Sequence, residues 1–180
     1  MAKPRGQTTQ LHNMYVADFE TGDSERIYTV DKTTGKPIYY QRVWLAGHKN
    51  LKTMESKYFN NLDDFMKDIL GRGNNTHREY AFHNLKFDGS FIIPWLFKNG
   101  YECVQDKPLP GQFSVLVDDK NNWYNITIQV TKRRKITLWD MLKLFPTALE
   151  YLPDIYSTPT KKVQEDQEFY TKHRPEGYEP

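Results

Sequence analysis

The stretch YVADFETGDS, residues 15–24, decides the fold, because two carboxylates follow directly on an apolar run. Residues 13–21, NMYVADFET, are typical of a short buried strand that ends in polar residues. Side chains alternate along a strand, so Asp18 and Glu20 share one face while Phe19 points to the other. Two carboxylates at one strand end repel each other unless a positive charge neutralises them. A pair of Mg²⁺ or Mn²⁺ ions, which prefer carboxylate oxygen, would do so.

The alternative interpretation of Asp18-Phe19-Glu20 is a solvated strand end that enters a turn. A second motif is therefore needed to support a metal site. YAFHNLKFDGSFI, residues 80–92, predicts a strand-to-helix junction with Asp88 in the first helical turn. The positive end of a helix dipole tolerates a carboxylate there, and Asp88 alone reads as an ordinary N-terminal helix acid. Bases of single-stranded nucleic acid stack on aromatic rings. Asp88 has such rings and polar donors as sequence neighbours: His83, Asn84, Phe87 and Phe91.

Composition indicates one domain of ordinary size, because the chain has 180 residues, 38% of them hydrophobic, and a net charge of +2. The single cysteine, Cys103, offers no disulfide framework, which favours a reducing cytoplasm. It lies in a predicted strand start, GYECV, and is not expected to be a nucleophile. No apolar run approaches the roughly 20 residues of a membrane span, and residues 1–12 read as a flexible leader without a secretory signal.

The order of predicted elements favours an α/β fold, a mixed sheet with helices packed on it. Asn60 or Asn61 can cap the first helix, and Gly71 and Gly73 end it. Pro94 lies inside the second helix. In chain order we expect a strand over 13–21, a hairpin over 26–50, an edge strand within 52–60, a helix within 60–71, a strand over 79–84, a helix over 86–100, antiparallel strands within 112–142 and a helix from near Asp140.

Taken together, these motifs resemble a known family. DFET and FHNLKFDGSFI are similar to the first two exonuclease motifs of DnaQ-like proofreading domains, Asp-x-Glu and Asn-x-x-(Phe/Tyr)-Asp. The variant most resembles the protein-primed, phi29-like family-B DNA polymerases of phages. NNLDDFMKDIL, KRRKITLWDMLKLFP and YTKHRPEGY agree with it, so the similarity runs from Met14 onward. The resemblance implies a ribonuclease-H-like, DnaQ-like exonuclease fold over residues 13–156, followed by a charged tail over 157–180.

Carried over residue by residue, the resemblance implies metal binding by Asp18, Glu20 and Asp88, with two Mg²⁺ or Mn²⁺ ions as cofactors. It implies a 3′→5′ exonuclease of the phage replication machinery in the host cytoplasm, acting on single-stranded DNA ends. Contacts to the 3′ end of that strand would come from Thr21, His83, Asn84, Phe87, Phe91 and Leu142. Lys162, or Lys161 beside it, matches a lysine that assists catalysis, although a solvated charged turn is an equal alternative.

The family's third motif, Tyr-x-x-x-Asp beyond RPxGY, has no counterpart in these 180 residues. Three interpretations stay open: a piece of a longer polymerase, a small phage protein derived from the exonuclease domain, or a nuclease that recruits another acid. Candidates for that acid are Asp140, Asp154, Asp166 and Glu168. Losing an essential positioning group commonly costs several powers of ten in rate.

A binding protein is therefore the alternative to an enzyme. It would keep the fold without turnover and bind single-stranded DNA, a terminal protein or polymerase domains. The basic run KRRK, residues 132–135, suits a phosphate contact, although such runs are more often solvated hairpin tips.

Overall fold

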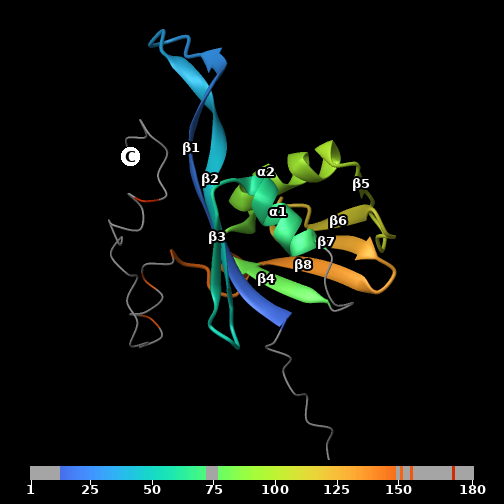
Figure 1. The fold of residues 1–180 in the computed structure, drawn as a ribbon. Coiled ribbons are helices and arrows are strands. Elements are labelled where there is room, and N and C mark those ends of the chain that lie inside the picture. The colour runs from blue at the N-terminus through green and yellow to red at the C-terminus, as the bar shows by residue number, and fades with distance from the viewer. Residues whose placement is uncertain (1–12, 72–76, 149–150, 152–154, 156–171, 173–180) are drawn as a thin grey trace, which may run out of the picture.

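A computed structural model describes residues 13–71 and 77–148 together with Tyr151, Ile155 and Lys172. These residues form one eight-stranded mixed sheet in the order β3-β2-β1-β4-β8-β7-β6-β5, with two α-helices packed on it (Figure 1). The bounds of the elements are β1 Met14–Val30, β2 Pro37–Asn50, β3 Ser56–Phe59, α1 Leu62–Leu70, β4 Arg78–Phe82, α2 Leu85–Lys98, β5 Glu102–Cys103, β6 Gln112–Val117, β7 Trp123–Thr131, β8 Arg134–Asp140 and the 3-10 turn η2 Met141–Lys143.

The centre of the sheet is parallel, and this places the polar strand ends side by side. β1 pairs in parallel with β4, as Val16 does with Ala81, and β4 pairs in parallel with β8, as Phe82 does with Asp140. Parallel strands end at the same edge of a sheet. The residues that follow β4 therefore lie beside the end of β8, and Asp18 lies just beyond the last β1–β4 pair.

The strand that carries Asp18 and Glu20 is longer than the sequence predicts. The sequence predicts that this strand ends near Thr21 and that a separate hairpin spans residues 26–50. The antiparallel pairing of Ile27 with Tyr39 confirms the hairpin, but β1 runs without a break from Met14 to Val30 and pairs with β2 along its length. The expectation that the two carboxylates lie at a strand end is therefore wrong. The strand continues because β-branched and aromatic residues resume after Gly22, and irregularities in the ladder, one between Glu20 and Thr21, absorb the polar stretch.

The hydrophobic core lies between one face of the sheet and helices α1 and α2. The alternation predicted for residues 13–21 holds, since Ala17 and Phe19 are buried in this core and Asp18 is exposed. Phe19 packs edge-on against Phe65 of α1 and Phe82 of β4, at centroid distances of 5.0 and 5.4 Å. The apolar face of β1 thus holds the strand on the core, while its other face carries the acids.

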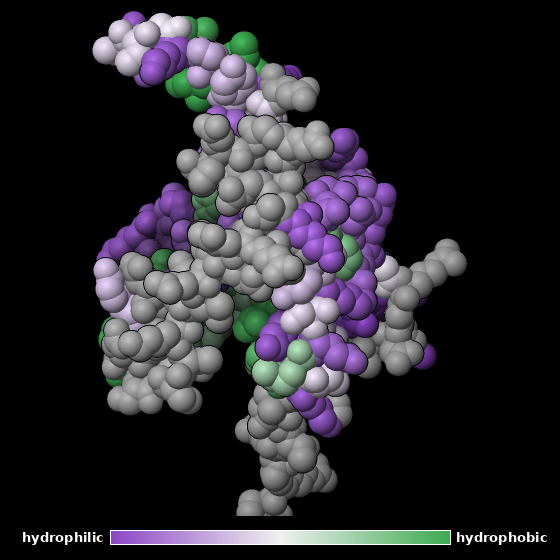
Figure 2. All heavy atoms as spheres, turned by 60° about the vertical axis from the view of Figure 1, so that its left-hand side comes forward, coloured by the Kyte–Doolittle hydropathy of each residue, from purple (hydrophilic) through white to green (hydrophobic). Residues whose placement is uncertain are grey.

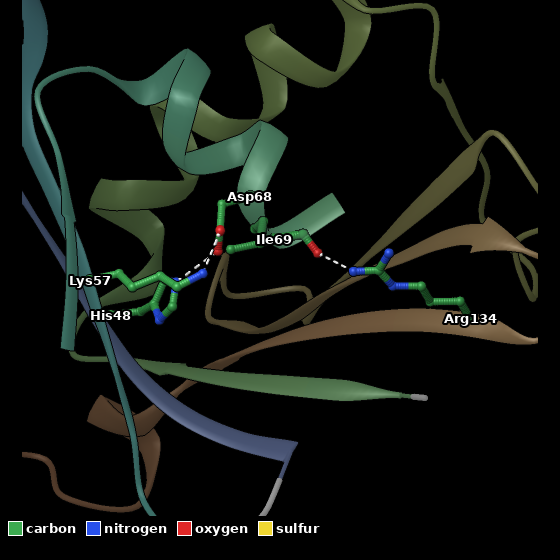
Figure 3. A network of polar contacts seen from close by, with 5 residues as sticks. All are labelled: His48, Lys57, Asp68, Ile69 and Arg134. Carbon is green, nitrogen blue, oxygen red and sulfur yellow. Dashed lines mark hydrogen bonds and ion pairs between the residues drawn. The ribbon is translucent and has the colours of Figure 1, made fainter. Parts of the chain in front are cut away.

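Helix α1 is fastened to three strands by polar contacts (Figure 3). The Asp68 carboxylate contacts Nε2 of His48 at 3.0 Å and accepts a hydrogen bond from Nζ of Lys57 at 2.8 Å. Burial lowers the pKa of His48, although Asp68 opposes this effect. At the end of α1, the Arg134 guanidinium donates to the carbonyl of Ile69 at 2.8 Å, which satisfies a backbone acceptor left free there.

Most local predictions for the remaining elements are confirmed. Asn61 is the residue that caps α1, because its side chain accepts from the backbone N–H of Asp64 at 2.8 Å. Helix α2 continues through Pro94 and is followed by Gly100 at a φ of +82°. The helix expected from near Asp140 is wrong, since a 3-10 turn stands there. Pro146, which restricts the residue before it and cannot donate, explains why that turn does not lengthen.

Candidate carboxylate site

Asp88 is the most unusual titratable group of the described residues. It lies in the first turn of α2, after Asn84, whose backbone is left-handed at a φ of 65°. The Asp88 side chain is only 2% exposed, and its Oδ1 has no hydrogen-bond partner within the part of the chain that the structure describes. Burial above all, and then the charge of Asp18, raises the pKa of Asp88 to about 8, well above its ordinary value. Near neutral pH this carboxyl holds its proton unless a cation compensates its charge.

Asp18 and Glu20 reach the same region from β1. Their charges both contribute to the raised pKa of Asp88, and that of Asp18 contributes more. On β2 their ladder partners are Gly47 and Leu45. Asp18 is exposed and Glu20 is half-buried, so these two acids are open to a ligand from solvent while Asp88 closes the site from the protein side.

Asp140 is a fourth acid at this site. It ends β8, is buried, and its charge also raises the pKa of Asp88. Its carboxylate accepts a hydrogen bond from the backbone N–H of Leu142 at 3.0 Å and so caps η2. The sequence offered Asp140 only as one of four candidates, and the parallel β4–β8 pairing is what brings it close. The other three, Asp154, Asp166 and Glu168, lie outside the described residues.

The predicted DNA contacts lie on the elements that carry these acids or directly next to them in the chain. Phe87 and Phe91 form an edge-to-face pair with ring centroids 5.6 Å apart, and Phe87 is 43% exposed. His83 and Asn84 occupy the junction between β4 and α2. Thr21 directly follows Glu20 on β1 and Leu142 lies in η2, each half-buried. Lys161 and Lys162 lie outside the described residues, as do residues 1–12 and all of the predicted tail except Lys172.

The basic run at residues 132–135 divides between two environments. Lys132 and Arg133 are exposed at the β7–β8 turn, as expected of a hairpin tip. Arg134 is only 3% exposed and is bound to the end of α1. The predicted phosphate contact is therefore wrong for Arg134.

A cavity of about 870 Å³ borders the acids on the sheet face away from the helices. Asp18, Glu20 and His83 line it, together with apolar side chains from β1, β2 and β8 that include Leu45 and Trp139. This cavity was not predicted from the sequence. Val16, an apolar residue on the same face of β1 as Asp18, was the available signal.

The acids provide a donor set that suits a hard divalent cation. Asp18, Glu20 and Asp88 offer oxygen ligands only, which Mg²⁺ and Mn²⁺ prefer, and Oδ1 of Asp88 is buried without a hydrogen bond to the described residues. Within that part of the chain, no three His, Cys, Asp or Glu side chains are already grouped as a metal site. The chemistry of the residues fits a cation, and the side chains would have to converge to bind one.

Comparison with known proteins places the chain in a family. The family model of DNA polymerase type B, organellar and viral, matches residues 71–178. The DNA polymerases of Bacillus phages PZA and phi29 are each 34% identical to the chain, over 159 and 158 residues. The match to the PZA polymerase covers 86% of this chain but 26% of that protein, so the chain spans about a quarter of the length of the curated relatives it matches.

Solved structures agree with the sequence matches. A structure of Phi29 DNA polymerase complexed with single-stranded DNA is similar to the chain with a TM-score of 0.67 and 30% identity, over 92% of this chain and 27% of that one. A ternary complex of the same polymerase with primer-template DNA and incoming nucleotides gives a TM-score of 0.68 at 31% identity, over 93% of this chain and 26% of that one. The predicted fold class and the resemblance to phi29-like polymerases are thereby confirmed. The chain belongs to the organellar and viral type B DNA polymerases.

Proposed function

We propose that the chain is a metal-dependent 3′→5′ exonuclease domain of such a polymerase, which removes nucleotides from single-stranded DNA ends during replication. The observation that carries the proposal is the buried Asp88 carboxyl beside Asp18, with a pKa near 8 and an oxygen without a hydrogen-bond partner in the described chain. A cluster of like charges around a buried carboxyl lowers the stability of a fold. Its presence therefore supports a functional site. The structural likeness to a polymerase complexed with single-stranded DNA supports the same proposal.

In this proposal each residue of the site has a defined role. Asp18, Glu20 and Asp88 hold two Mg²⁺ or Mn²⁺ ions. When bound, such ions would lower the pKa of a water molecule and stabilise the negative charge on the phosphodiester that is cleaved. The exposed ring of Phe87, with Phe91 behind it, stacks on a terminal base. His83, Asn84, Thr21 and Leu142 orient the strand, and Lys162 is proposed to act near the phosphate.

A second candidate function is binding of single-stranded DNA without hydrolysis. The observation that favours it is that the acids of the described residues are not grouped as a finished metal site. A terminal protein or the remaining polymerase domains are further candidate partners, whether the chain is an exonuclease or a DNA-binding protein without hydrolysis. The two candidates predict the same DNA affinity and differ only in cleavage, so one experiment can separate them.

The test is digestion of a 5′-labelled single strand in Mg²⁺ or Mn²⁺ by the parent and by an Asp18→Ala, Glu20→Ala double variant. A matched control, Asp106→Ala with Asp119→Ala, removes two exposed loop acids instead. Stepwise shortening from the 3′ end by the parent and the control, but not by the site variant, would support the exonuclease. DNA binding without any shortening would reject it in favour of the binding protein.

A further inference from the structure

The distal part of the β1–β2 ribbon projects beyond the body of the molecule (Figure 1). We define this segment as residues 26–42, the distal ribbon. It holds the ends of two antiparallel strands joined by a turn, in which the Asp31 carboxylate accepts from the backbone N–H groups of Thr33 and Thr34. An isolated two-stranded ribbon is marginally stable in water, so a ribbon of this length requires a reason.

One face of the distal ribbon combines cations with aromatic rings. The Arg26 guanidinium lies 4.9 Å from the ring centroid of Tyr40, and the rings of Tyr28 and Tyr40 meet edge-to-face with centroids 4.9 Å apart. Arg42 follows Tyr40 by two residues on β2 and therefore shares its face. Tyr28 is 63% exposed and Tyr40 is 41% exposed, although both are large and partly apolar. Hydrophobic and hydrophilic residues accordingly stand side by side on the projection in Figure 2.

The charge of the distal ribbon selects the class of partner. Its four basic residues, Arg26, Lys32, Lys36 and Arg42, outnumber its single acid, Asp31, which gives residues 26–42 a formal charge of +3. Asp23, the ladder partner of Gln41, and Glu25 precede this segment on β1 and reduce the formal charge to +1 over residues 22–42. Asp31 is already engaged by its own turn, and within the described chain no ion pair occupies any of these four cations. Cations that form no ion pair with the described residues, interleaved with exposed rings, suit a polyanion that also carries stacking faces, which is single-stranded nucleic acid.

Strand β1 connects the distal ribbon to the carboxylate site. Asp18 and Glu20 lie on the same unbroken strand as Arg26, which comes six positions after Glu20. At roughly 3.3 Å per residue this is about 20 Å, which about six stacked nucleotides would span. A strand whose 3′ end lies at the acids can therefore reach the ribbon.

We propose that Arg26, Tyr28, Tyr40 and Arg42 form a secondary binding surface for single-stranded DNA, on which the strand leading to the carboxylate site rests. The inference extends the proposed function, because it needs the 3′ end to be held at the acids. Binding of DNA to the ribbon does not require cleavage. The ribbon adds affinity for long strands only, through phosphate contacts from the arginines and base stacking on the tyrosines.

The test is fluorescence anisotropy with labelled oligothymidylates of about 5 and about 20 nucleotides in chelator, so that no cleavage intervenes. The ribbon variants are Tyr28→Ser with Tyr40→Ser, and Arg26→Gln with Arg42→Gln. The matched controls are Tyr124→Ser, and Lys107→Gln with Lys120→Gln, which remove an exposed ring and two exposed charges elsewhere. Equal melting temperatures of variants and parent confirm that all of them fold.

For the long strand, we expect the tyrosine variant to bind about 10-fold or more weakly, the loss typical of a removed stacking contact. The arginine variant should lower the slope of log affinity against log salt by about 1.4, which corresponds to two phosphate contacts on a single strand. The short strand and both controls should be unaffected.

Two results would overturn the proposal and differ in what they say of the proposed function. If the ribbon variants bind the long strand as the parent does while Phe87→Ala binds it weakly, the ribbon is not a DNA surface and the exonuclease site stands. If the parent binds neither strand, both proposals fail. Ribbon-dependent binding by a parent that never shortens DNA would support the ribbon and reject the exonuclease.

Discussion

At the scale of single residues, Asp88 is the group whose environment departs furthest from water. The side chain is buried at a helix start, and three further acids, Asp18, Asp140 and Glu20, raise its pKa. A helix N-terminus normally favours a charged carboxylate. Here burial and like charges outweigh that effect, so the protonated form of Asp88 is favoured when no cation is bound.

The first prediction concerns the pH dependence of stability in chelator. The pKa of Asp88 is about 8 in the folded chain and ordinary when unfolded, so the folded state binds the proton more tightly. Its stabilisation is complete below about pH 4 and is lost as the pH rises towards 8. Between these values the melting temperature of the parent should fall relative to Asp88→Asn by at least about 2–4 °C, the equivalent of about 1 kcal/mol. Calorimetry at several pH values would measure it.

The exposed acid Asp119 provides the control for that experiment. Asp119→Asn is the matched variant, because it removes an exposed carboxyl in place of the buried one. If the profiles of parent and Asp88→Asn run parallel, Asp88 does not titrate between folded and unfolded states as described.

The second prediction concerns Phe87, whose exposed ring makes little contribution to the core. Phe87→Ala should weaken binding of single-stranded DNA by about 1–3 kcal/mol, the range for a lost base–aromatic contact, at nearly unchanged melting temperature. Phe97→Ala is the matched control, because that ring lies on the same helix and is 54% exposed. Equal affinities of the two variants in an anisotropy titration would exclude the stacking role of Phe87.

At the scale of elements, helix α2 fixes the position of Asp88 through its close approach to β7. A Cβ at Gly89 would lie 2.7 Å from the Trp123 ring and 3.2 Å from Cδ1 of Ile126. The Trp123 ring is itself held, since its Nε1 donates to Asn121 at 3.2 Å. The glycine therefore allows the helix to pack at the depth that buries its neighbour Asp88.

The third prediction follows from this packing and has an unusual sign. Gly→Ala inside a helix ordinarily stabilises by roughly 0.5–1 kcal/mol. Gly89→Ala should instead destabilise by about 1–3 kcal/mol, because the methyl group overpacks the helix against β7. Denaturant unfolding would measure it, with the exposed neighbour Ser90→Ala as control. A stabilised Gly89→Ala variant would show that α2 can shift freely.

Elements with local signals were predictable, and elements fixed by distant pairing were not. The cap at Asn61 and the period of residues 62–70 predicted α1, and the apolar residues within the predicted strand 79–84 indicated β4. The length of β1 was not predictable, because its continuation depends on pairing with β2 across irregular steps. The sequence predicts Asp18, Glu20 and Asp88 as site acids, and their role stays a prediction. The contribution of Asp140 to the charge around Asp88 depends on the non-local pairing of β8 with β4.

At the scale of the whole molecule, the proposed binding of a cation by the acids would be linked to folding. A ligand that binds only the folded state raises stability with its concentration relative to its dissociation constant. The described helices include none long and apolar enough to cross a membrane.

The fourth prediction is that Mn²⁺ or Mg²⁺ raises the melting temperature of the parent. At 100 times the dissociation constant the gain is about 2.7 kcal/mol, or several degrees for a chain of this size. The Asp18→Ala, Glu20→Ala variant should not respond, whereas Asp106→Ala with Asp119→Ala should respond fully. Thermal scans over a cation titration measure the effect. An equal response of the site variant would place the cation elsewhere.

The unbroken course of β1 makes the reach of the ribbon adjustable independently of the body. Inserting two residues directly after Val30 and two directly before Pro37 would lengthen both strands and the projection by about 7 Å and leave the other side chains on their original faces. Inserting a single residue into β2 between Pro37 and Tyr40 would instead change which residues face each other. The length of the ribbon could thus be changed by protein engineering in steps of two residues per strand.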